Sequence, residues 1–186
     1  SKAYISRPFA RLLAEQGLSF DAVTDGELEV LSAAGVDLSR VYFHGNNKTP
    51  AELTRAIELG TGRIVIDGFD EITTLDRVAG EAGMVQRVLL RVSPGVDAHT
   101  HEKTTTGILD SKFGLPIEKG AAAEAIRLIL TAPNLEFRGL HMHLGSPIFV
   151  LEPYRLGIEV MAEFIAEVCI AKLGTTVPEF SPGGGF

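Results

Sequence analysis

The sequence predicts an α/β fold with a parallel sheet, in the form of a (β/α)8 TIM-like barrel that is incomplete, at about seven of eight units. Short β-rich runs alternate with amphipathic helical patterns along the chain, and such alternation forms βαβ units with parallel strands. Glycines stand where the helices should end, and polar or glycine-rich segments follow the strands. An open doubly wound sheet remains the structural alternative, because its order of elements is the same.

Six β-rich runs are predicted strands, and a seventh would end just before Lys2. The six runs are 18–23, 40–45, 63–68, 88–93, 135–145 and 176–181. A closed barrel needs eight units, so one more is required. The longest irregular stretch is 94–114, and loops of that length in compact domains are often functional.

Six segments between the strands show helical periodicity. They are 7–16, 26–35, 49–60, 69–83, 119–130 and 153–172. In the third, Leu53, Ala56 and Ile57 recur at the i, i+3, i+4 spacing of a buried helix face. Thr49 suits the N-cap position and Pro50 the first helical position. The glycines at expected helix ends are Gly35, Gly60 and Gly83.

The composition is typical of a soluble globular protein, with 45% hydrophobic and 22% charged residues. A chain of 186 residues can form one domain, over 1–186. No apolar run approaches the roughly 20 residues of a membrane helix, and a net charge of −7 argues against a nucleic-acid surface. Cys169, the one cysteine, lies in an apolar helical pattern and is predicted to be a core residue. Without a disulfide framework, we expect a cytoplasmic location.

Both ends of the sequence interrupt segments that look functional. The chain opens SKAY, with no initiator methionine, and closes SPGGGF. We therefore expect a fragment of a longer protein. Because an unclosed barrel leaves bare strand edges that invite aggregation, we expect these residues alone to be neither stable nor active.

Polar or glycine-rich groups recur at the carboxyl ends of successive predicted strands. In order they are Lys2, Asp21, His44 with Asn46 and Asn47, Asp67, Arg91, His143, and Gly183 to Gly185. In a (β/α)8 barrel the active site occupies that end of the strands. The sequence therefore predicts one site to which successive units contribute.

Three features at or near these strand ends suit a phosphate-bearing ligand: the glycines, Lys2 and Ser146. Each also has a simpler interpretation. Glycines 183–185 let backbone N–H groups converge on a phosphate, and the alternative is a tight turn. Lys2, on a rigid strand, can attack a carbonyl as a free amine, or it is an ordinary surface lysine. Ser146 can donate to a phosphate oxygen, or it is a turn residue.

The histidines of GLHMHLGS lie two residues apart, and period-2 geometry points His141 and His143 to one face of a strand. A metal pair, a core or rim position, and an imidazole stacked on a planar cofactor all remain open. No third ligand stands at a telling spacing, so no metal site is predicted. Arg91 and Asp21 lie inside apolar runs, which indicates either a functional site or a structural ion pair.

Three segments together resemble the pyridoxal-phosphate-dependent decarboxylases of the alanine-racemase-like barrel fold. They are FHGNNKTPAEL (43–53), RVSPGVDAHTHEKTTTGILDSKFGL (91–115) and GLHMHLGSPI (139–148). Within that family the similarity is to the diaminopimelate decarboxylases. The long segment is far more specific than a glycine cluster, and the resemblance covers the chain from Lys2 to the last glycines.

The resemblance implies roles for individual residues. Lys2 matches the lysine that holds pyridoxal 5'-phosphate as a Schiff base, and His143 matches the histidine stacked on the pyridine ring, so these two are the catalytic candidates. Ser146 and glycines 183–185 match phosphate-binding elements, and three further polar residues match the pocket near the lysine and ring. The candidate cofactor-binding residues are Lys2, Asp21, Glu27, Arg91, His143, Ser146, Gly183, Gly184 and Gly185.

Compared with the family pattern, this sequence lacks an eighth strand and the C-terminal β-domain. That domain contributes residues partly across a dimer interface, so the resemblance implies a homodimer for the full-length protein. Asp25 replaces a usual glycine, Pro147 replaces a usual glutamine after Ser146, and SPGGG replaces an apolar entry to the glycines. These departures affect cofactor contacts more than the fold.

The reaction implied by the resemblance is decarboxylation of meso-2,6-diaminopimelate to L-lysine, a small-molecule amino-acid substrate. The DAHTH loop within 94–114 is expected to close over it. Alternatives are a family decarboxylase acting on carboxynorspermidine, ornithine or arginine, and a non-catalytic relative that binds the cofactor or only a partner protein. A cofactor-free barrel that takes phosphorylated sugars is a further alternative.

Overall fold

The computed structural model describes residues 4–96 and 113–185, which fall into two compact units. The first unit comprises 1–88 and 132–136, and the second comprises 89–131 and 137–186. Strands β4 (Gln86–Ser93) and β6 (Leu135–His141) begin in the first unit and end in the second.

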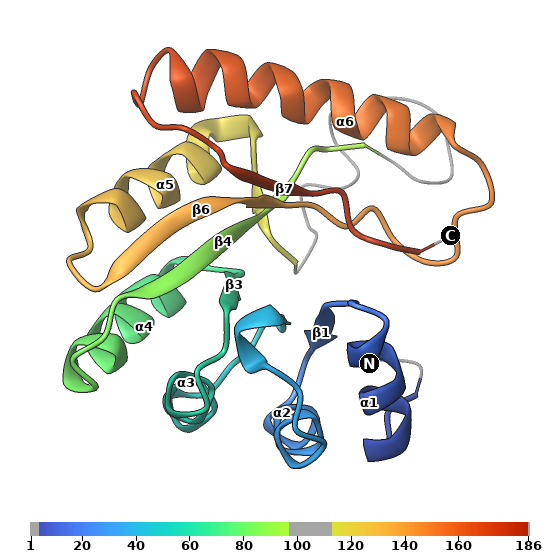
Figure 1. The fold of residues 1–186 in the computed structure, drawn as a ribbon. Coiled ribbons are helices and arrows are strands. Elements are labelled where there is room, and N and C mark those ends of the chain that lie inside the picture. Colours follow the sequence, from blue (N-terminus) through green and yellow to red (C-terminus); the bar gives the residue numbers. More distant parts are fainter. Residues whose placement is uncertain (1–3, 97–112, 186) are drawn as a thin grey trace. The chain divides into compact units, whose positions relative to one another are not determined.

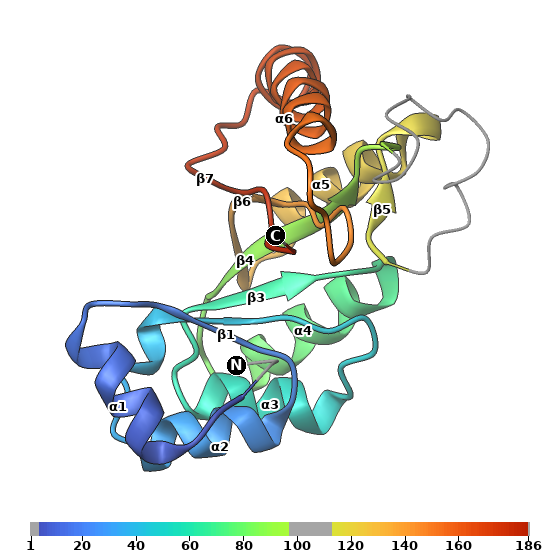
Figure 2. The ribbon, with the colours of Figure 1, turned by 90° about the vertical axis from the view of Figure 1, so that its right-hand side faces the viewer.

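The first unit is a parallel sheet with its helices gathered on one side (Figures 1 and 2). Its strands β1 (Phe20–Ala22), β2 (Val41–Phe43), β3 (Arg63–Ile66) and the start of β4 are neighbours in that order. The pairs β1–β2 and β2–β3 are parallel. Its helices are α1 (Arg7–Glu15), α2 (Asp25–Ala33), α3 (Pro50–Glu58) and α4 (Phe69–Glu81), with a 3-10 turn at Leu38–Arg40.

The core of the first unit lies between the sheet and these helices. Phe43 and Ile64 from the strands, Leu53 and Ile57 from α3, and Leu75 from α4 are almost completely buried. Burial of each side chain of this size contributes about 1.5–3 kcal/mol. The inner face predicted for 49–60 is therefore correct, and α4 forms within the predicted range 69–83.

The predicted helix boundaries are largely confirmed. Thr49 is the N-cap of α3, where its side chain accepts from the Glu52 N–H, and the Glu52 carboxylate accepts from the Thr49 N–H at 2.8 Å. Thr24 and Glu27 form the same reciprocal cap on α2, which was not predicted although the T-x-x-E signature is present. The glycines just beyond α2, α3 and α4 are, as predicted, Gly35, Gly60 and Gly83.

The second unit pairs the end of β4 with β6, and β6 with β7 (Glu179–Ser181). The short strand β5 (Leu115–Pro116), which was not predicted, runs parallel to β4, and β7 runs parallel to β6. Its helices are α5 (Ala121–Thr131), after a 3-10 turn at Glu118–Gly120, and α6 (Glu152–Phe164). Figure 1 shows α5 and α6 on the same side of β6 and β7.

Two strands are shorter than predicted because prolines flank them. The run 176–181 becomes a strand only at Glu179, since Pro178 has no N–H to donate to a ladder. The run 135–145 ends as a strand at His141, which pairs with Ser181, and Pro182 then ends the partner strand.

The long helical pattern at 153–172 divides into two kinds of helix. After α6 the chain continues as a π-helix over Ile165–Ile170, a distinction that apolar periodicity does not reveal. Cys169 lies in this turn and is buried, as predicted. Burial raises the pKa of its thiol to about 11, so the side chain is a neutral core group.

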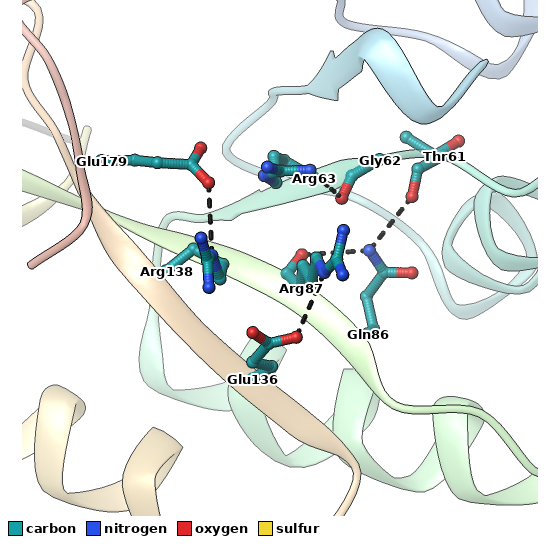
Figure 3. Close-up of polar contacts among 8 residues, drawn as sticks. All are labelled: Thr61, Gly62, Arg63, Gln86, Arg87, Glu136, Arg138 and Glu179. Carbon is teal, nitrogen blue, oxygen red and sulfur yellow. Dashed lines mark hydrogen bonds and ion pairs between the residues drawn. The ribbon is translucent and has the colours of Figure 1, made fainter. Parts of the chain in front are cut away.

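Polar contacts gather near the amino ends of several strands (Figure 3). In the first unit, Arg87 Nε lies 3.1 Å from Glu136 Oε2, and the Gln86 side chain donates to the Thr61 carbonyl oxygen. In the second unit, Arg138 Nε lies 3.3 Å from Glu179 Oε1. These contacts lie away from the carboxyl ends of the strands, where parallel α/β folds bind ligands, so we assign them to stability.

The alternation of parallel strands with helices confirms the predicted α/β class. The strand expected before Lys2 and the DAHTH loop lie outside the described residues. Within the described ranges, every helix is too short or too polar to cross a membrane.

Candidate cofactor site

The segment that follows β7 is a glycine turn, defined here as residues 182–185, and it runs beside the segment that follows β6. The Met142 N–H donates to the Ser181 carbonyl oxygen at 2.9 Å, which continues the β6–β7 pairing by one bond. The Ile148 N–H donates to the Gly185 carbonyl oxygen at 2.7 Å. Backbone hydrogen bonds therefore hold the turn at both ends.

Two of the three glycines are required by the shape of this turn. Gly183 has φ 77° and Gly185 has φ 116°, values that favour glycine. A Cβ on Gly183 would lie 2.5 Å from the Met142 carbonyl oxygen, and one on Gly185 would overlap the Gly145 carbonyl oxygen. Both glycines are thus pressed against the segment after β6.

Gly184 has the opposite surroundings. It is exposed, and a Cβ on it would meet no atom within 4 Å. Its carbonyl oxygen accepts from the Tyr154 hydroxyl of α6 at 2.8 Å. The turn is therefore closed on the sides of Gly183 and Gly185 and open at Gly184.

The open side offers hydrogen-bond donors. In the described part of the chain, the N–H groups of Gly184 and Gly185 have no acceptor, whereas the Gly183 N–H points to the Ser181 hydroxyl at 3.4 Å. Consecutive backbone N–H groups in such a turn form a concavity that binds anions. The turn has donors of the kind that a cofactor phosphate needs, and the phosphate-binding role of Gly183 to Gly185 stays a prediction.

His143 lies directly beside the glycine turn. A Cβ on Gly183 would lie 3.0 Å from His143 Nδ1. The imidazole is half-buried, in contrast to that of His141, which is 5% exposed and has its Nδ1 3.1 Å from the Ser181 hydroxyl. Because β6 ends at His141, His143 lies beyond the strand. The alternation that predicted both imidazoles on one face of a strand therefore does not apply to it. His141 is a core histidine, and His143 is the one that reaches the turn.

Ser146 is exposed, two residues before the Ile148 N–H that bonds the turn. The Ser146–Pro147 peptide bond is cis. Ser146 therefore stays a predicted phosphate contact, from a segment that the structure places beside the glycines. Pro147 occupies the position of the departure from the family pattern and is also exposed.

Arg91, near the carboxyl end of β4, is half-buried. Its guanidinium lies 4.8 Å from the centroid of the Phe113 ring. A Cβ on Gly114 would lie 3.1 Å from Arg91 Cγ. The Phe113 ring covers part of the Arg91 guanidinium and so accounts for some of the burial of that side chain.

Asp21 and Glu27 belong to the first unit. The Asp21 side chain is 71% exposed, although apolar residues flank it in the sequence, and its Oδ1 lies 3.3 Å from His44 Nε2. The Glu27 carboxylate accepts from the N–H groups of Val23, at 2.7 Å, and Thr24, at 3.0 Å. Glu27 therefore caps α2, and the Asp21 carboxylate contacts the imidazole of His44 on the rim.

Lys2 and the loop at 97–112 lie outside the described residues. The rim segment 44–47 provides His44 to Asp21, while Asn46 and Asn47 are exposed there. Asp67 follows β3 and is 8% exposed, and its N–H donates to Glu71. Among the described residues, no three His, Cys, Asp or Glu side chains are grouped as metal ligands.

Two features of this end of the strands were missed by sequence reasoning. One is Tyr154, whose role depends on a contact with Gly184, 30 residues along the chain, and no local pattern signals it. The other is a buried ion pair between Lys48 and Glu71. For that pair the only signal was a lysine inside the segment FHGNNKTPAEL.

We expect Tyr154→Phe in the full-length protein to lower the free energy of unfolding by about 0.5–1.5 kcal/mol, the usual contribution of one hydrogen bond. The hydroxyl is held neutral, because burial raises the pKa of Tyr154, so it acts as a donor to Gly184. Chemical denaturation measures the loss. Tyr4→Phe is the control, since Tyr4 is 65% exposed, and equal losses in both variants would contradict a specific role for Tyr154.

A family model described as the pyridoxal binding domain of pyridoxal-dependent decarboxylases matches residues 1–186. The chain is 43% identical over 182 residues to a diaminopimelate decarboxylase of Mycobacterium bovis, which covers 98% of this chain and 39% of that protein. It is 44% identical over 159 residues to one of Bacillus subtilis, covering 86% of this chain and 36% of that protein.

Solved structures show the same similarity. The diaminopimelate decarboxylase of M. jannaschii matches with a TM-score of 0.89 and 30% identity, over 97% of this chain and 41% of that one. That of Helicobacter pylori, complexed with L-lysine, matches with a TM-score of 0.85 and 29% identity, over 97% and 45%. The predicted incomplete barrel is thereby confirmed over the open doubly wound sheet. The chain spans about two fifths of the length of these relatives.

Proposed function

The chain belongs to the family of pyridoxal-dependent decarboxylases, matching its pyridoxal binding domain, and from that premise we propose that the full-length protein decarboxylates meso-2,6-diaminopimelate to L-lysine and CO2. The observation that carries the proposal is the glycine turn at 182–185. It has an open side with two N–H groups available and His143 at its edge. The diaminopimelate decarboxylases at 43–44% identity support the choice of substrate.

The second unit would hold the phosphate end and one face of the cofactor. The N–H groups of Gly184 and Gly185 would donate to phosphate oxygens, and Tyr154 fixes the intervening carbonyl so that these donors keep their direction. The Ser146 hydroxyl would add a further donor. His143, 3.0 Å from a Cβ placed on Gly183, would lie flat against the ring and exclude water from that face.

The remaining candidates have roles that the family resemblance implies. Lys2 would hold the cofactor through its side-chain amine. Asp21, Glu27 and Arg91 would be polar residues of the pocket, with Asp21 oriented by His44. Pyridoxal phosphate, when bound, supplies an electron sink for the pair of electrons left on the substrate carbon when its bond to the departing CO2 breaks.

We also propose that the protein acts in the cytoplasm, in lysine biosynthesis. It works as a homodimer, because the family's C-terminal domain contributes across the subunit interface. Its partners are small amino acids rather than nucleic acid, in keeping with the net charge of −7.

The test uses the full-length protein with added pyridoxal phosphate. Release of CO2 is measured from meso-diaminopimelate, L-ornithine, L-arginine and carboxynorspermidine, and we expect kcat/KM for diaminopimelate to exceed the others by at least about 100-fold, or about 2.7 kcal/mol in transition-state binding. A higher value for another substrate would replace the proposed one. Cofactor binding without CO2 release from any of them would support a non-catalytic relative.

The cofactor attachment is tested separately. Borohydride reduction of the loaded protein should fix the cofactor to the peptide that contains Lys2, as read by mass spectrometry. A label on a different lysine would remove Lys2 from the proposal and transfer its role to that residue. No label on any lysine would favour a barrel that works without the cofactor.

A further inference from the structure

The first unit contains a lysine whose ammonium group is removed from water. The Lys48 side chain is 1% exposed, and its Nζ donates to the carbonyl oxygens of Gly45, at 2.6 Å, and Val65, at 2.9 Å. Nζ also lies 2.8 Å from Glu71 Oε1, and 5.9 Å from the centroid of the Phe43 ring. Lysine is almost never fully buried unless it is paired, so this arrangement indicates a specific task.

The partners of Lys48 come from two successive strand-to-helix junctions, the one after β2 and the one after β3. Gly45 lies in the loop after β2, Val65 lies near the end of β3, and Glu71 lies in the first turn of α4. The other Glu71 oxygen accepts from the Asp67 N–H at 3.1 Å, just beyond β3. One ammonium group thus fixes the carboxyl ends of β2 and β3 to the start of α4.

The loop held by Lys48 carries His44, the residue next to Gly45. A Cβ on Gly45 would lie 3.5 Å from Lys48 Cγ and 3.4 Å from the Val23 carbonyl oxygen, so the loop is packed between Lys48 and the end of β1. The His44 N–H donates to the Ala22 carbonyl oxygen at 2.7 Å. The imidazole is 16% exposed, and its Nε2 lies 3.3 Å from Asp21 Oδ1.

We propose that Lys48, together with Glu71, is a positioning device for the His44–Asp21 pair, and through it for the cofactor. Asp21 is on an exposed strand end, where a carboxylate has many accessible orientations. His44 limits them, and the Lys48 ammonium fixes the backbone from which His44 extends. The inference rests on the proposed function, because it takes Asp21 as a polar residue of the cofactor pocket.

The test is a thermodynamic cycle on the full-length protein with the affinity for pyridoxal phosphate as its readout. The variants are Lys48→Met/Glu71→Leu, which removes both charges together, Asp21→Asn, and the combination of all three changes. Affinity is titrated on the apo proteins, and their unfolding is measured in parallel. Removal of the ion pair should weaken cofactor binding about tenfold. This is the lower end of the loss seen when residues that orient the direct ligands of a metal site are removed, which is the nearest comparison for a positioning residue.

The decisive comparison is between the two backgrounds. With Asp21→Asn already present, removal of the ion pair should weaken cofactor binding less than about twofold, while the loss in unfolding stability stays the same. A merely structural role predicts equal weakening in both backgrounds, and that result would overturn the proposal. Arg55→Met/Glu29→Leu is the matched control, because it removes an exposed ion pair between α3 and α2 and should leave the affinity unchanged.

The outcome is distinguishable from failure of the proposed function. A wild-type protein that binds pyridoxal phosphate but releases no CO2 from diaminopimelate would end the proposed activity, and the affinity cycle would still decide the role of Lys48. A wild-type protein that does not bind the cofactor would overturn both.

Discussion

Replacing Lys48 by methionine is expected to lower the free energy of unfolding of the full-length protein by about 3–5 kcal/mol, because the change leaves a buried carboxylate without its partner. Glu71, the partner, is only 10% exposed. The carbonyl oxygens of Gly45 and Val65 lose their donor in the same variant. Urea unfolding followed by circular dichroism measures the loss.

Two further variants identify its cause. Arg77→Met removes an exposed ion pair with Glu81 on α4 and should cost far less, since exposed pairs contribute little. Lys48→Met/Glu71→Leu should recover part of the loss, leaving about 1–3 kcal/mol for the backbone groups of Gly45, Val65 and Asp67 that lose their side-chain partners. If Lys48→Met were as mild as Arg77→Met, the ion pair would not be buried as described.

The loss should also depend on pH. Burial raises the pKa of Glu71 above its usual range, and the charge of Lys48 opposes that rise. In Lys48→Met the pKa of Glu71 in the folded protein is higher still. The variant therefore loses stability as the pH rises from the pKa of Glu71 in the unfolded chain, about 4.3, through its pKa in the folded protein. We therefore expect a smaller deficit at pH 5 than at pH 8, whereas a deficit independent of pH would contradict a buried, ionised Glu71.

The elements of this fold follow from local chemistry, which is why the sequence predicted them. Thr49 and Pro50 begin α3 through a side-chain cap and a preset φ, both readable from neighbouring residues. Prolines also explain the errors at strand ends, since Pro178 and Pro182 bound β7. Glu27 shows the limit of assigning one role to one residue, because its carboxylate caps α2 at the position where the family resemblance suggests a pocket residue.

The candidate site was predictable only in part, because its geometry depends on contacts between distant segments. The sequence indicated that the glycines form a candidate phosphate-binding turn. It did not indicate which of them faces the ligand. That distinction arises from the packing of Gly183 and Gly185 against 142–145, some 40 residues earlier. The Lys48–Glu71 pair joins two junctions 23 residues apart. Neither arrangement leaves a periodic or motif signal in the sequence.

Alanine at Gly183 is expected to abolish tight binding of pyridoxal phosphate, with an affinity loss of at least about 100-fold, and to destabilise the apo protein. The added Cβ would lie 2.5 Å from the Met142 carbonyl oxygen and 3.0 Å from His143 Nδ1, so both the turn and the imidazole must move. The φ of 77° adds about 1–2 kcal/mol of backbone strain for a residue with a side chain. Cofactor titration and urea unfolding of the apo protein measure the two effects.

Alanine at Gly184 separates ligand binding from folding at the neighbouring position. Its Cβ would meet no protein atom within 4 Å, so the free energy of unfolding of the apo protein should change by less than about 0.5 kcal/mol, as for an ordinary surface substitution. The methyl group would nevertheless occupy the side on which we place the phosphate. Displacing one charge-assisted hydrogen bond, worth about 1.5–3 kcal/mol, corresponds to a loss in cofactor affinity of about 10- to 150-fold. An unchanged affinity in Gly184→Ala, beside a large loss in Gly183→Ala, would mean that the turn supports His143 and that the phosphate binds elsewhere.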